Sequence, residues 1–172
     1  MPITVARTAC ATLFAVLLST PVFAQFVPPP PQTADLSGPR FGLSLLSEDL
    51  VAKLAERDVV VNTHISQFGW QLEKLFYTRG SGVSMVTEFV ALVGGLDQSV
   101  ALPSVSWMVG VRTRDGAEFG IGPNVTPAGT ALVLATGMTF RAGAFNIPVN
   151  VAVVPSKAGS RVTFLSGISL RR

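Results

Sequence analysis

Large apolar residues alternate with small or polar ones along most of the sequence after residue 58. In the segment 129–141, for example, Leu132, Leu134, Met138 and Phe140 share one parity, and small residues occupy most of the other positions. Because successive side chains of a strand point to opposite faces, this period of two predicts β-strands. The pattern predicts eight of them, at residues 40–47, 59–78, 83–94, 101–113, 117–123, 129–141, 145–154 and 161–171.

Short turn sequences rich in glycine separate the predicted strands, and Asp115-Gly116 is the best hairpin dipeptide among them. An even number of strands joined by short turns predicts an all-β fold, an antiparallel up-and-down β-barrel of about eight strands. One short helix is expected near the N-terminus, at residues 47–57, where Ser47 is a suitable N-cap. Pro148 interrupts a predicted strand, and a bulge between Asn146 and Asn150 would accommodate it.

The two faces of the predicted strands differ in side-chain size. Bulky apolar residues gather on one face, and glycine, alanine, serine and asparagine on the other. In a transmembrane barrel the bulky face contacts lipid, whereas in a soluble barrel it fills the core. On the membrane interpretation the following residues are expected to face lipid: Trp107, Phe119, Leu132, Leu134, Val149 and Val151.

The composition favours the membrane interpretation. Hydrophobic residues make up 48% of the sequence and charged residues only 13%, whereas soluble domains usually contain about a quarter charged residues. The net charge is +3 and the basic residues form no cluster, which argues against nucleic acid as a partner.

Four charged residues lie within predicted strands: Glu73, Glu88, Arg112 and Glu118. By alternation they fall on the face of small residues, which would be the interior of a membrane barrel. Because an unpaired buried charge costs several kcal/mol, we expect them to form a charge network in the lumen. Such a network fills space in a narrow barrel, and a conducting or proton-linked role is the alternative.

The N-terminal region has the features of an export signal followed by a linker. Residues 1–24 combine Arg7, an apolar run too short to span a bilayer, and small residues ending at Ala24. Residues 25–39 contain four consecutive prolines and are expected to be a Pro-rich linker, so the barrel domain would comprise residues 40–172. Cys10 is the only cysteine and lies in the signal, so cleavage would leave no thiol.

The sequence contains few candidates for catalytic or ligand-binding residues. His64 and Ser66 are two residues apart and would point to the same side of a strand. In an acyl-transferring barrel the histidine could activate the serine hydroxyl as a nucleophile. No acid that would orient the histidine is apparent. We therefore interpret His64 as a polar residue at the rim of the barrel and expect no catalytic residues. No group of residues has metal-ligand spacing, and we expect neither a metal nor a cofactor.

Alternating strands such as residues 107–112 (WMVGVR), with the export signal and short turns, resemble the small eight-stranded outer-membrane barrels of the OmpA transmembrane-domain type. Residues 66–74, 118–124 and 146–157 also resemble blocks of exported bacterial proteins with no assigned activity. The resemblance covers residues 40–172 and implies a location in the outer membrane, with outer-membrane lipid as the surrounding partner. Any protein partners are unknown from the sequence.

The sequence therefore predicts a small outer-membrane barrel with a structural or adhesive role and no catalytic activity. Outer-membrane barrels usually end on an aromatic residue, whereas this sequence ends on Leu170-Arg171-Arg172. For that reason a soluble periplasmic barrel that binds a lipid or another apolar ligand is kept as the alternative.

Overall fold

The computed structural model describes residues 35–78 and 82–170. The predicted signal peptide and most of the predicted linker lie outside these residues. Along the described chain the elements are β1 (Gly38–Leu46), α2 (Glu48–Ala55), β2 (His64–Thr78), β3 (Ser84–Gly94), η1 (Leu96–Gln98), β4 (Leu102–Arg112), β5 (Ala117–Thr126), β6 (Gly129–Ala142), β7 (Phe145–Ser156), β8 (Gly159–Gly167) and β9 (Ser169–Leu170).

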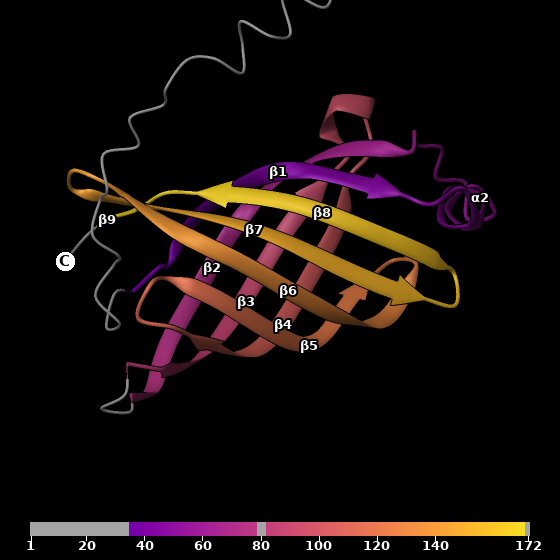
Figure 1. The fold of residues 1–172 in the computed structure, drawn as a ribbon. Helices are drawn as coiled ribbons and strands as arrows, with labels where there is room; N and C mark the ends of the chain where they lie inside the picture. The colour runs from indigo at the N-terminus through magenta and orange to yellow at the C-terminus, as the bar shows by residue number, and fades with distance from the viewer. Residues whose placement is uncertain (1–34, 79–81, 171–172) are drawn as a thin grey trace, which may run out of the picture.

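Strands β1 to β8 form a closed antiparallel barrel (Figure 1). Each strand pairs with the next along the chain, and β1 closes the sheet by pairing with both β2 and β8. Phe41, for example, lies opposite Phe68 on one side and Ser166 on the other. The predicted all-β, eight-stranded up-and-down barrel with one short helix is thus confirmed. Because the described barrel is closed, its sheet has no edge strand with which a strand of another chain could pair.

The strand boundaries differ from the predicted ones mainly at β2, which begins at His64 rather than at residue 59. The valine run 59–61 suggested a strand because β-branched residues favour one. In the structure Val61 lies outside the strand and is buried beside Leu54 and Ile65 at the barrel mouth, where it packs against α2.

No bulge is present at Asn146–Asn150, contrary to the prediction. The ladder between β6 and β7 keeps one register through this region, with Pro148 opposite Thr139. On the other side of β7, pairing with β8 ends at Val149, and pairing with β9 resumes in the same register at Asn146. Pro148 therefore lies where the ladder on that side is interrupted, which suits a residue without a backbone donor.

Helix α2 lies at one end of the barrel (Figure 1), where it packs against residues at the ends of the strands. Ser47 caps it by accepting a hydrogen bond from the Leu50 backbone N–H, as predicted from the sequence. The Ser47 hydroxyl also accepts from the Ser160 backbone N–H, so the cap fastens the helix to β8. The helix buries Leu50 and Leu54 against Leu46, Val61, Ile65 and Leu102. Within the described residues, no helix has the length and apolar character needed to cross a membrane.

The two ends of the barrel differ. Its described N- and C-terminal segments lie together at the end opposite α2 (Figure 1). Connections at the α2 end include the segment between β1 and β2, which carries the helix, and the segment between β3 and β4, which carries η1. Connections at the other end are the tight turns between β4 and β5 and between β6 and β7, and the partly described segment between β2 and β3. We refer to these as the helix end and the terminal end.

Candidate functional site

The interior of the barrel holds most of the charged side chains that belong to its strands. Eight residues of the described strands are charged, and seven of them lie on inward rows, whose members are mostly buried or half-buried. These seven are Arg40, Glu73, Glu88, Arg112, Glu118, Arg141 and Arg161. Lys74 is the only charged strand residue on an outward row of the described barrel. The period-two placement of each side chain explains this separation, because a one-residue shift would send the charges outward.

Glu73, Glu88, Arg112 and Glu118, the four predicted lumen residues, lie together near the terminal end. The Arg112 guanidinium donates to the Glu118 carboxylate from Nε at 2.7 Å and to Glu73 Oε1 from Nη1 at 2.8 Å, and its Nη2 contacts both carboxylates. The Arg112 and Glu73 side chains are fully shielded from solvent. Charge-assisted bonds of this kind are roughly twice as strong as neutral ones, so Arg112 links β4 to β2 and β5.

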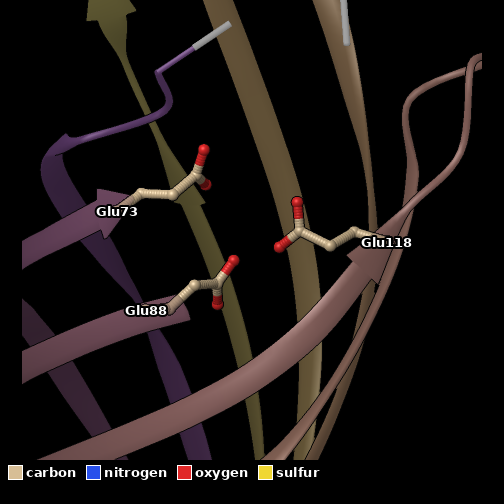
Figure 2. A group of neighbouring side chains, drawn as sticks. All are labelled: Glu73, Glu88 and Glu118. Carbon is tan, nitrogen blue, oxygen red and sulfur yellow. The ribbon is translucent and has the colours of Figure 1, made fainter. Parts of the chain in front are cut away.

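Glu88 completes a group of three carboxylates that project inward from β2, β3 and β5 (Figure 2). Glu73, Glu88 and Glu118 each offer an oxygen within 4.8 Å of the others. A hard divalent cation accepts oxygen ligands in such an arrangement. Here, however, the Arg112 guanidinium already binds two of the three carboxylates, so a metal ion would have to compete with it.

Arg40 belongs to this network and was missed by the sequence analysis. Its Nε donates to Gln71 Oε1 at 3.0 Å and its Nη2 to the Leu36 carbonyl at 2.6 Å, and it interacts electrostatically with Glu88. The period-two pattern could have revealed it, because Arg40 shares the face of small residues with Gly42 and Ser44.

The end of the predicted linker also contacts this network. Leu36 is almost fully buried, and its backbone N–H donates to Glu73. Residues directly before β1 thereby lie against the charged interior at the terminal end.

An apolar layer fills the middle of the barrel. It consists of Val90, Leu92, Met108, Val133, Ala135 and Val154, all buried and drawn from four strands. A cavity of only about 40 Å³ is left among the side chains of this layer. This is close to the space of a single water molecule, so side chains fill the middle of the lumen.

The six residues predicted to face lipid lie on outward rows. Trp107 is 60% exposed, and Phe119, Leu132, Leu134 and Val149 are also exposed. Val151 is half-buried and belongs to the same row of β7 as Val149. Large exposed apolar residues occur on every strand from β1 to β8, so they form a continuous belt around the barrel. We call this set of outward side chains the apolar belt.

His64 and Ser66 both point outward at the helix end of β2. The Ser66 hydroxyl donates to the Asp97 carboxylate in η1 at 2.5 Å, and this hydrogen bond lowers the pKa of Asp97. Within the described residues no hydrogen bond joins His64 to Ser66. The arrangement fastens η1 to β2, and the serine donates to an acid rather than to the histidine that would have to activate it.

A second polar group lies near the helix end, around Arg161 of β8. Arg161 Nη2 donates to Asn124 Oδ1 at 3.0 Å and to Ser104 Oγ at 3.3 Å. The Asn124 amide in turn donates to Ser104 and Ser106 at 2.9 Å each. None of these residues was predicted as a site residue, although alternation places all of them on inward rows.

Comparison with known proteins adds no assignment to these observations. No protein-family model matches the chain, and neither the curated proteins nor the solved structures give a match.

Proposed function

We propose that this protein is a small outer-membrane β-barrel with a structural or adhesive role and without catalytic activity. The observation that carries the proposal is the separation of charge between the two faces of the strands. Among the described strand residues, seven of eight charges point inward while bulky apolar side chains point outward all round the barrel. A water-exposed surface normally carries many charges, and an apolar band of this extent is typical of a lipid-facing one.

The strand lengths fit a bilayer. Strands β1 to β8 contain 9 to 15 residues each. A tilted transmembrane strand needs about 9–11 residues to cross the hydrocarbon core. The barrel is also closed, as a membrane requires, because an open edge would leave backbone polar groups without partners in lipid.

The asymmetry of the two ends suggests an orientation. Outer-membrane barrels have short periplasmic turns and longer extracellular connections. The described connections that carry α2 and η1 lie at the helix end, and the described terminal segments lie opposite. We therefore place the helix end outside the cell and the terminal end in the periplasm, where the predicted N-terminal linker would join β1.

The filled interior supports a structural rather than a transport role. Ion pairs occupy the terminal end of the interior. Apolar side chains fill its middle, and α2 packs against residues at the other end. The alternative, a soluble barrel with an apolar ligand inside it, needs an internal cavity. Lipid and cofactor sites usually measure about 300–1,000 Å³, whereas the cavity in the middle of the barrel measures about 40 Å³. A larger cavity of about 400 Å³ lies at the helix end, but Arg161 and Lys157 belong to its lining, which does not suit a wholly apolar ligand.

Cell fractionation tests this proposal. The full chain, expressed in a bacterium with an outer membrane, should sediment with outer membranes and stay there after washing with sodium carbonate or urea. A soluble periplasmic marker protein in the same cells provides the control, and should be released by osmotic shock. Release of the barrel together with that marker would contradict the membrane assignment and favour the periplasmic alternative.

A further inference from the structure

The charged groups at the two ends of the interior differ in how they are compensated. At the terminal end, Arg112 is held between two carboxylates. At the helix end, the guanidinium of Arg161 donates to the neutral side chains of Ser104 and Asn124. Its Nε–H is buried and has no acceptor among residues 35–78 and 82–170. Within the described part of the chain, no carboxylate forms an ion pair with Arg161.

An uncompensated cation is costly in such a position. Arg161 lies on an inward row of β8 and is only partly exposed. A buried charge without a counterion costs several kcal/mol in a folded protein, and guanidinium has five donors that require acceptors. An anion bound beside Arg161 would supply both the missing charge and the missing acceptors.

A cavity of about 400 Å³ lies beside Arg161 and provides room for such an anion. It is formed by the turns between β5 and β6 and between β7 and β8, with Leu50 of α2 at one side. Its lining includes the cations Arg161 and Lys157 and not a single acidic residue. Hydroxyl groups from Thr130 and Ser156 also belong to the lining.

We propose that this cavity at the helix end binds the phosphate or carboxylate group of a small anionic ligand. Arg161 receives the anion, since its planar fork matches two oxygens of a phosphate or carboxylate. Lys157 contributes a second positive charge from the turn between β7 and β8. The apolar lining residues Ala131 and Val154 accommodate a short hydrocarbon portion. The volume lies within the range of small-molecule sites, and the inference is independent of the membrane assignment.

Titration of the full chain, refolded in a zwitterionic detergent, tests this proposal. The probes are inorganic phosphate, glycerol 3-phosphate and acetate, with uncharged glycerol as the negative control. Calorimetry gives the affinity, and the ¹⁵N-labelled arginine Nε–H resonances report which guanidinium the anion reaches. We expect saturable binding of an anion, with a shift of the Arg161 resonance, and weaker binding as the salt concentration rises.

Three variants show whether the named residues hold the anion. Arg161→Gln should weaken binding at least about tenfold, which corresponds to about 1.4 kcal/mol, and Lys157→Gln should weaken it less. Arg114→Gln removes the same charge from the exposed turn at the opposite end and should leave the affinity unchanged. If Arg161→Gln does not fold, Lys157→Gln and the Arg161 resonance in the unmodified protein still decide the question.

A last comparison separates a free ligand from a lipid headgroup. A short-chain phosphatidic acid that binds more tightly than glycerol 3-phosphate would indicate a lipid as the source of the anion, and equal affinities a soluble ligand. Either result supports the anion site. The absence of saturable binding by every anion would overturn the proposal, as would equal affinities for Arg161→Gln and the unmodified protein.

Discussion

Removing Arg112 should destabilise the barrel far more than removing an exposed arginine. The Arg112→Leu variant keeps an apolar side chain inside β4 but leaves Glu73 and Glu118 without the guanidinium that binds them both. Breaking a buried ion pair on one side costs about 3–5 kcal/mol, because the remaining charge is uncompensated. Coulomb's law gives a similar size, about 4 kcal/mol for unit charges 4 Å apart at an effective dielectric constant of 20.

The assay is urea-induced unfolding of the full chain in detergent micelles, followed by tryptophan fluorescence. Arg114→Leu is the matched control, since Arg114 lies two residues further on and is exposed. The free energy of unfolding should fall by about 3–5 kcal/mol for Arg112→Leu and by less than about 0.5 kcal/mol for the control. Equal stabilities of the two variants would refute the inferred network.

A compensating variant separates lost charge from lost packing. When Glu73→Gln and Glu118→Gln accompany Arg112→Leu, no uncompensated carboxylate faces the missing guanidinium, so a large part of the stability should return. Glu88→Gln alone should cost little, because the network holds three carboxylates and only the two guanidiniums of Arg40 and Arg112. A triple variant as unstable as Arg112→Leu would show that packing, rather than charge, dominates.

Three further tests concern the apolar belt, the helix and the close approach of two strands. In lipid vesicles, Ile121→Arg at the middle of β5 should cost about 2–4 kcal/mol and Val125→Arg near its end about 0–1 kcal/mol, as measured by urea unfolding; equal costs would contradict a lipid-facing belt. Leu54→Ala, in the buried face of α2, should cost about 2–5 kcal/mol, and no change in the unfolding midpoint would show that the helix is only loosely docked. Gly122→Ala places a methyl group on the backbone carbonyl of β4 and should cost about 1–3 kcal/mol. Gly120→Ala, which has ordinary space, should be far milder, and circular dichroism melting curves distinguish the two glycine variants.

The sequence predicted the barrel well because alternation and turns are local signals. Eight segments with a period of two and glycine-rich turns are sufficient to place the strands and their two faces. The short helix followed from Ser47 and the apolar spacing after it. The start of β2 was predicted wrongly because Val61 packs against α2, which lies earlier in the chain. Alternation within a segment does not reveal such a tertiary contact.

The site was harder to predict because its contacts join distant strands. Arg112 and Glu73 are 39 residues apart, and alternation alone does not give the register that brings them together. Alternation could have identified Arg40 and Arg161 as inward-facing charges. It could not have shown that Arg40 joins the carboxylate network, while the hydrogen bonds of Arg161 within the described residues go to the neutral side chains of Ser104 and Asn124.

The measurement that bears most directly on the central claim is the contact between Trp107 and lipid. Trp107 lies in the middle of β4 on the apolar belt, and Trp70→Phe removes the other tryptophan. In vesicles of phosphatidylcholine brominated on its acyl chains, the account predicts that most of the Trp107 fluorescence is quenched and that aqueous iodide has little effect. Strong quenching by iodide together with no effect of the brominated lipid would contradict it.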